Sequence, residues 1–207
     1  MAIDLADLVD PSGTAILTME VQKGTIGAQS PFDELVQAAR TTDLVSNIGR
    51  LALSGRSKGI RVVHCTARFR NDLAGSGTNS PLLSAMTRHK IHILEDTEGA
   101  EIISEIYEPD IDLECARYHG VSPFSGTALD SMLSNMGVQT VVATGVSLNL
   151  AILGLCIEAV NLGYRVALPI DAVAGFPKQY ADSLISNTLS LLATRTTVDE
   201  LIGVWEQ

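Results

Sequence analysis

The sequence predicts an α/β protein, a three-layer, doubly wound α/β/α sandwich around a six-stranded, mainly parallel sheet. Short apolar runs of strand length alternate about six times with longer stretches whose apolar residues recur at helical spacing. The strand-like runs are continuously hydrophobic, which is typical of parallel strands buried on both faces. Residues 138–167 show the clearest unit, with a strand, a glycine turn, an apolar helix and a second strand in succession. Repeated units of this kind, joined by right-handed crossovers, give a Rossmann-like sheet.

The chain is expected to form one domain over residues 1–207, with residues 1–12 as an N-terminal arm. Strands are expected where β-branched and other apolar residues gather, at 14–21, 60–65, 111–117, 138–143, 164–169 and 195–197. Helices are expected at 32–55, 81–86 and 125–135, after the glycine turn to near Gly163, at 179–192 and from Val198 onward. Loops are expected between them, chiefly at 22–31 and 68–80. The last helix should be capped by Thr196 or Thr197, because Glu200 follows Thr197 at capping-box spacing.

The composition excludes several classes of function. Hydrophobic residues make up 46% of the chain and charged residues 18%, so we expect a folded globular protein. The net charge is −10 without any basic stripe, which argues against a nucleic-acid or anionic-membrane partner. The three cysteines are widely spaced, which indicates reduced thiols in a cytoplasmic protein. The N-terminal residues lack a signal-peptide pattern, and no apolar run reaches membrane-spanning length.

A candidate site lies at the carboxyl ends of the predicted strands, where ligands of doubly wound folds bind. Residues of chemical or conformational interest fall at this edge: Glu20, Cys65, Arg117, Gly145 and Asp171. The turn at 144–147 joins a strand end to a helix N-terminus, so its N–H groups and the helix dipole favour a developing anion. The polar loop at 68–80 is expected to cover the edge, where Arg68 and Arg70 are candidate contacts for a substrate anion.

Several familiar catalytic motifs are absent from the sequence. It has no glycine-rich nucleotide loop and no G-x-S-x-G elbow of a serine hydrolase. His89 and His92 are three residues apart, but they lack further ligands at metal spacing, so we expect no zinc site there. Cys156 lies inside the helix after the glycine turn, and we expect a core residue rather than a nucleophile. No cofactor is expected.

Three segments resemble motifs of one enzyme family. A-I-L-T-M-E-V-Q at 15–22 is similar to the first strand of the isochorismatase-like hydrolase superfamily. S-P-F-S-G-T-A-L-D-S-M-L at 122–133 resembles a second motif of that family, and V-V-A-T-G-V-S-L-N-L-A-I at 141–152 resembles its nucleophile turn. The segments occur in the family's order, and the resemblance extends from residue 14 to residue 205. It implies a six-stranded parallel sheet and a homodimer or homotetramer.

The resemblance implies, for the amidohydrolase members, an Asp-Lys-Cys triad whose cysteine attacks a carbonyl carbon. The corresponding positions here hold Glu20, Arg117 and Ala151, although strict counting places Tyr118 at the lysine position. A methyl group cannot attack a carbonyl, so a thioester mechanism at Ala151 is excluded. Metal-binding members carry an Asp-x-His pair that residues 66–70 lack, so we expect no catalytic metal.

The resemblance also assigns the surroundings of the site. The turn of Gly145, Val146 and Ser147 is expected to form an oxyanion hole, shaped by a cis peptide bond between Val146 and Ser147. Substrate contacts are expected from a group of flanking residues: Gln22, Tyr118, His119, Phe124 and Asn149. Among these, Asn149 is expected to orient Ser147 or cap the helix, and Phe124 to form a pocket wall.

Two functions remain open at this point. The first is a hydrolase of a small, carboxylate-bearing molecule that works without a cysteine nucleophile, by acid catalysis from Glu20 on a vinyl ether, ester or amide. True isochorismatases, which have a small residue at the cysteine position, cleave a vinyl ether in this way, and Arg117 is suited to hold a substrate carboxylate. The second is a catalytically inactive member, in which Glu20 and Arg117 form a buried ion pair. Such a protein binds a small ligand or serves as an oligomeric scaffold.

Overall fold

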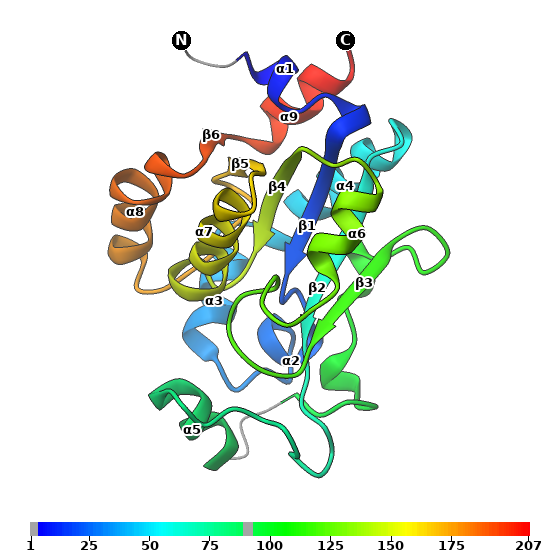
Figure 1. The fold of residues 1–207 in the computed structure, drawn as a ribbon. Helices are drawn as coiled ribbons and strands as arrows, with labels where there is room; N and C mark the ends of the chain where they lie inside the picture. The colour runs from blue at the N-terminus through cyan, green and yellow to red at the C-terminus, as the bar shows by residue number, and fades with distance from the viewer. Residues whose placement is uncertain (1–3, 89–92) are drawn as a thin grey trace.

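The computed structural model describes residues 4–88 and 93–207, which form a six-stranded sheet with helices on both faces (Figure 1). The strands are β1 (Thr14–Met19), β2 (Arg61–Ala67), β3 (Leu113–Arg117), β4 (Thr140–Gly145), β5 (Arg165–Pro169) and β6 (Thr194–Thr196). Their order in the sheet is β3-β2-β1-β4-β5-β6, and every neighbouring pair is parallel. The chain thus winds outward from β1 in both directions, and the predicted doubly wound α/β sandwich is confirmed.

The central strand β1 is buried along its whole length and separates two hydrophobic cores. Ile16 belongs to the core that includes Leu51 and Trp205 from the helices on one face. Its neighbour Leu17 belongs to the core that includes Leu133 and Leu155 on the other face. Because successive side chains of a strand point to opposite faces, a continuous apolar run fills both cores at once.

Helices cover both faces of the sheet. They are α1 (Leu5–Leu8), α2 (Lys23–Ile26), α3 (Asp33–Thr41), α4 (Leu44–Ser57), α5 (Pro81–Arg88), α6 (Leu129–Asn135), α7 (Leu153–Asn161), α8 (Lys178–Asn187) and α9 (Val198–Trp205). Short 3-10 turns lie at Pro11–Gly13, Glu98–Ala100, Ser104–Ile106 and Leu189–Leu191. A π-helical turn, Leu148–Ile152, precedes α7. No helix within the described residues is long and apolar enough to cross a membrane.

The predicted capping box of the last helix is confirmed. The Thr197 hydroxyl accepts a hydrogen bond from the Glu200 N–H at 3.2 Å, and the Glu200 carboxylate accepts one from the Thr197 N–H at 2.9 Å. The two residues therefore satisfy N–H groups that the first turn of α9 leaves without helical partners.

Three expected helices have other boundaries in the structure. The helix expected at 179–192 ends at Asn187 and is followed by the separate 3-10 turn Leu189–Leu191. The local backbone explains the other two. The single helix expected at 32–55 is two helices, because Asp43 adopts a left-handed conformation (φ 50°) between α3 and α4. The helix expected at 125–135 begins only at Leu129, because the left-handed Gly126 (φ 71°) belongs to a preceding turn.

The N-terminal arm is packed onto the domain from α1 onward. α1 contacts α9, and the indole Nε1 of Trp205 donates a 2.9 Å hydrogen bond to the carbonyl oxygen of Val9. Figure 1 shows these two terminal helices side by side at one end of the molecule. Leu8 and Val9 are buried, so this segment adds to the core rather than extending from it.

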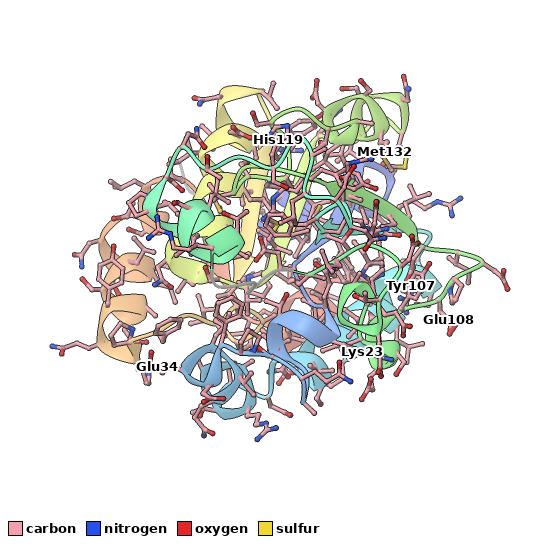
Figure 2. All side chains as sticks on the ribbon, turned by 90° about the horizontal axis from the view of Figure 1, so that it is seen from below. Lys23, Glu34, Tyr107, Glu108, His119 and Met132 are labelled. Carbon is pink, nitrogen blue, oxygen red and sulfur yellow. The ribbon has the colours of Figure 1, made fainter. Side chains whose placement is uncertain are left out.

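The carboxyl edge of the sheet lies at the end opposite the termini. In Figure 1 the arrowheads of β1, β3 and β4 point toward α2 and α5. Helix α2 lies within the stretch expected to be a loop at 22–31. Figure 2 views the molecule from this side, with Lys23 and His119 on opposite sides of the view. Any ligand site at the strand ends is therefore roofed by α2, α5 and the loop after β3.

Candidate active site

A cavity of about 290 Å³ lies at the carboxyl edge of the sheet. It is lined by seven of the predicted site residues: Glu20, Arg117, Tyr118, His119, Ser147, Asn149 and Ala151. Arg68 from the loop after β2 also lines it, whereas Arg70 forms a surface ion pair with Asp72. Much of the remaining wall is apolar and includes Leu82 and Leu83 of α5. The sequence-based expectation of a site at this edge therefore coincides with a cavity of ligand size.

Glu20 and Arg117 form an ion pair in the wall of this cavity. Glu20 follows β1 in a left-handed conformation (φ 53°), which is uncommon outside glycine, and its N–H donates to the Cys65 carbonyl oxygen at 2.9 Å. Arg117 ends β3, and its Nη2 donates to Glu20 Oε1. The Arg117 side chain is 7% exposed, and its Nε donates to the Gly120 carbonyl oxygen at 3.3 Å. Arg117, and not Tyr118, is therefore the residue in contact with the acidic position.

The glycine turn after β4 is held by main-chain hydrogen bonds. A Cβ atom at Gly145 (φ 106°) would lie 2.2 Å from the Met19 carbonyl oxygen, so only glycine fits. The N–H of Gly145 donates to Ala172 O and that of Val146 to Met19 O, each at 2.9 Å. The peptide bond between Val146 and Ser147 is cis, as the resemblance implies. Gly145 and Val146 thus have no N–H left for an oxyanion, which corrects that expectation. The Ser147 N–H has no partner within the described residues.

Ala151 lies in the π-helical turn and lines the cavity at the position where the family's cysteine is expected. None of the three thiols replaces it, because Cys65, Cys115 and Cys156 are buried and lie outside the cavity lining. Burial raises the pKa of the Cys156 thiol to about 12. The expectation that Cys156 is a core residue is confirmed, since it belongs to the core that α7 covers.

Unsatisfied polar atoms are concentrated in the residues that line the cavity. Four buried side-chain atoms there have no hydrogen-bond partner within the described residues: Thr25 Oγ1, Arg68 Nε, Arg117 Nη1 and Asn149 Oδ1. Among the described residues outside the cavity lining, only Ser76 Oγ and Thr140 Oγ1 are also buried without a hydrogen-bond partner. Each such group costs about 1–3 kcal/mol of stability, and folded proteins keep few of them. Four of the six such atoms among the described residues thus belong to residues that line the cavity.

Arg68 and Thr25 differ in how far the sequence indicated them. Arg68 was a candidate because a cation stands in a polar loop, and its Nη2 donates to Glu114 Oε1 and to Thr66 Oγ1. Thr25 was missed, because it lies in α2, where no motif or periodic pattern marks the chain. Only the packing of α2 against the carboxyl edge brings its hydroxyl to the cavity.

Gln22 and Phe124 lie outside the cavity lining, although both were expected to contact substrate. The Gln22 amide donates to Ala67 O at 3.0 Å and Ala100 O at 2.9 Å, and it accepts from Ala67 N–H at 2.8 Å. Phe124 stacks on Tyr164, with ring centroids 5.9 Å apart and planes at 24°. We therefore correct both assignments, because Gln22 ties neighbouring main-chain segments together and Phe124 packs in the core.

Asn149 does not play either of the structural roles expected for it, but it lines the cavity. Its Nδ2 donates to the Phe176 carbonyl oxygen at 2.8 Å rather than contacting Ser147 or capping the helix. A Cβ atom on Gly175 would lie 2.5 Å from Asn149 Oδ1, so glycine leaves room for this orientation. The amide nitrogen is thus occupied, and the oxygen is left as an acceptor.

The other candidates from the sequence do not add to the site. The Asp171 carboxylate accepts from the Val198 N–H at 3.0 and 3.2 Å and so fixes the start of α9. His89 and His92 lie outside the described residues. Within the described residues, no group of three or more His, Cys, Asp or Glu side chains is arranged to hold a metal ion.

The fold and cavity define a doubly wound α/β protein whose ligand site lies at the topological switch between β1 and β4. Residues 14–200 match the isochorismatase domain, and the chain belongs to the isochorismatase family. A cysteine hydrolase from Pseudomonas syringae pv. phaseolicola superposes with a TM-score of 0.84 at 19% identity, over 96% of this chain and 95% of that chain. The N-carbamoylsarcosine amidase of Thermoplasma acidophilum gives 0.71 at 21% identity, over 90% and 97%. At such identities these likenesses show the shared fold.

Two curated relatives are similar over part of the sequence. N-carbamoylsarcosine amidase from Arthrobacter sp. is 25% identical over 130 residues, which cover 63% of this chain and 49% of that protein. Nicotinamidase 3 from Arabidopsis thaliana is 33% identical over 113 residues, which cover 53% of this chain and 56% of that protein. The chain thus spans about half the length of the curated relatives it matches.

Proposed function

We propose that the protein is a hydrolase of a small, carboxylate-bearing molecule and works without a cysteine nucleophile. The observation that carries this proposal is that the Glu20 carboxylate, the Ser147 turn and Ala151 line one cavity. The amidase and nicotinamidase named among the relatives support hydrolysis as the reaction class. Ala151 leaves the position of the family's cysteine without a nucleophile, so in this proposal water attacks the substrate directly.

Glu20 is the proton-transfer group in this proposal. Arg117 Nη2 occupies Oε1, and no described residue donates to Oε2, which is left to exchange a proton. With a vinyl ether, Glu20 in its protonated form gives the proton on Oε2 to the alkene carbon and becomes a carboxylate, and the ether oxygen stabilises the resulting cation. Water then adds to that cation and returns a proton to Glu20, and the hemiketal breaks into an alcohol and a ketone. With an ester or amide, the Ser147 N–H is the donor that supports a tetrahedral oxyanion.

A catalytically inactive member is the second candidate. The ion pair of Glu20 with Arg117 favours it, because a carboxylate held by a buried guanidinium is also a stable structural element. In that case the cavity binds a small ligand, or the protein serves as an oligomeric scaffold. Exposed apolar side chains on and after α7, Ile157, Val160 and Leu162, support a homodimer or homotetramer in either case. Free, buried cysteines support a cytoplasmic location.

The Glu20→Gln variant tests the proposal. Wild-type protein should hydrolyse at least one member of a panel of carboxylate-bearing vinyl ethers, esters and amides, and the variant should lose about 100-fold or more in kcat. Glu101→Gln is the matched control, because Glu101 pairs with Lys23 at the surface and lies outside the cavity lining. Absence of wild-type turnover across the panel would favour the inactive member, whereas equal turnover in the two variants would show that Glu20 is not the proton-transfer group.

A further inference from the structure

We infer that the cavity binds a small amphiphilic monocarboxylate, held at its charged end between Arg68 and Arg117 and at its apolar end against α5. The inference rests on the proposed function, because it names the ligand class of the same cavity. It adds Arg68 as a second anchor and specifies the charge and shape of the ligand. Three features of the cavity wall carry it.

The first feature is a pair of arginines in the cavity lining, each with one buried side-chain nitrogen that lacks a partner within the described residues. Arg68 follows β2 and its N–H donates to the Arg117 carbonyl oxygen at 3.0 Å, so the two residues are adjacent across the strand ends. Arg68 gives its Nη2 to Glu114, and Arg117 gives its Nη2 to Glu20. Within the described residues, Arg68 Nε and Arg117 Nη1 have no hydrogen-bond partner. A planar carboxylate has two oxygens, one for each of these donors.

The charge balance selects a monoanion. Each arginine is already neutralised by its own carboxylate, so the pair offers hydrogen bonds without excess positive charge. A carboxylate brings one delocalised negative charge, and its two oxygens accept one charge-assisted hydrogen bond from each arginine. A phosphate-like dianion adds a second charge next to Glu20 and Glu114, and within the described residues no other arginine or lysine lines the cavity to compensate it.

The second feature is the apolar part of the cavity wall. Leu82 and Leu83 of α5, Leu35 of α3, and the rings of Phe32 and Phe176 line the same cavity. A volume of about 290 Å³ is at the small end of ligand sites, which suits one ring or a short branched chain. Burying such a group gains the hydrophobic contribution that the carboxylate alone lacks.

The third feature is a pair of buried side-chain oxygens, Asn149 Oδ1 and Thr25 Oγ1, that accept no hydrogen bond from the described residues. Asn149 Oδ1 is an acceptor, because the amide nitrogen already donates to Phe176 O. Thr25 Oγ1 is buried and unpartnered in the same wall. An N–H or O–H group on the ligand satisfies either atom, so a hydroxylated or amino-substituted monocarboxylate fits better than a plain one.

Direct binding measurements test the charge and the apolar body separately. By titration calorimetry or ligand-observed NMR, benzoate should bind about tenfold more tightly than benzamide, and more tightly than acetate or phenylphosphonate. Equal binding of benzamide and benzoate would overturn the carboxylate anchor. Stronger binding of phenylphosphonate would overturn the monoanion, and equal binding of acetate would overturn the apolar wall.

A pair of arginine variants identifies the anchor. Arg68→Met should weaken benzoate binding about tenfold, because it removes Nε, while benzamide binding should change little. Arg70→Met is the matched control, since Arg70 lies two residues away and pairs with Asp72 outside the cavity. If Arg68→Met and Arg70→Met bind benzoate equally well, the inference is wrong. Benzoate binding by a protein that turns over no member of the vinyl ether, ester and amide panel would refute the proposed reaction and leave this inference standing, whereas turnover without carboxylate preference would do the reverse.

Discussion

Two groups of charged side chains, one buried and one only partly buried, lie on the same sheet and differ in how completely their hydrogen bonds are made. The core network consists of Thr18, His64, Arg56 and Asp112, and the cavity network of Glu20, Arg117, Arg68 and Glu114. In the core network the Asp112 carboxylate accepts hydrogen bonds from Arg56 Nε at 2.9 Å, His64 Nε2 at 3.0 Å and the Glu108 N–H at 2.9 Å. In the cavity network each arginine keeps one buried nitrogen without a partner.

The comparison shows that catalytic residue types do not by themselves make a catalytic site. Thr18 Oγ1, His64 and Asp112 are linked in the order of a hydroxyl-imidazole-carboxylate triad, with Oγ1 2.6 Å from His64 Nδ1. Yet Thr18 and His64 are each 1% exposed, and neither lines the cavity. A network that is buried and fully hydrogen-bonded stabilises the fold, whereas unsatisfied donors beside a cavity support the proposed ligand site.

Asp112→Asn should have the largest effect on stability. It leaves Arg56, whose side chain is 13% exposed, without its buried counter-charge, and we expect the free energy of unfolding to fall by about 3–5 kcal/mol. Urea unfolding measures this change. Asp199→Asn is the matched control, because Asp199 pairs with Arg50 at the surface, where loss of the pair should cost less than about 1 kcal/mol. Equal losses would show that the core network is not structural.

The free energy of unfolding should depend on pH through the Asp112 carboxylate. Burial raises the pKa of Asp112, but hydrogen bonds from His64 and Arg56 outweigh burial and hold that pKa at about 2. Because an unfolded aspartate titrates near pH ~3.9, Asp112 contributes stability above that pH, which is lost as the pH falls toward ~2. The free energy of unfolding should therefore fall more steeply across this window in wild type than in Asp112→Asn. Parallel curves would contradict the assignment.

Thr18→Val should have a smaller effect within the core network. Valine keeps the shape but leaves His64 Nδ1 without its hydroxyl partner, at an expected cost of about 1–3 kcal/mol in the free energy of unfolding. Thr140→Val is the control, since Thr140 is equally buried in the neighbouring strand β4 and its hydroxyl has no partner. That variant should be neutral or slightly more stable. A loss at Thr140 equal to that at Thr18 would show that side-chain shape, and not the hydrogen bond, decides both.

The fold could be predicted from the sequence because the positions of the hydrophobic runs largely determine where the buried strands lie. Strands such as β1 and β4, buried on both faces, are unmistakable in the sequence, and residues at their carboxyl ends such as Glu20 must share one edge. The helix boundaries failed at Asp43 and Gly126, where one left-handed residue redirects the chain without changing the apolar pattern.

The site was only partly predictable, for a different physical reason. Arg117 and Ala151 follow from motif positions, but the role of a side chain depends on which hydrogen bonds its neighbours already satisfy. Gln22 has three main-chain partners, and Arg68 has one donor to spare, although both follow strands in much the same way. Thr25 reaches the cavity through the packing of α2, which no local pattern encodes.

Thr25→Val should have the smallest effect on stability and the most informative effect on function. The Thr25 hydroxyl is buried and unpartnered, so an isosteric methyl group should leave the free energy of unfolding unchanged or raise it by up to about 1 kcal/mol. Thr140→Val shares this expectation but lies outside the cavity, so the two variants should differ only in binding. Weaker binding of 4-hydroxybenzoate or 4-aminobenzoate by Thr25→Val alone would show that an unsatisfied hydroxyl is kept for the ligand, at the expense of stability. A loss of stability as large as that of Thr18→Val would instead place Thr25 with the core network, and the contrast between the two networks would not hold at this position.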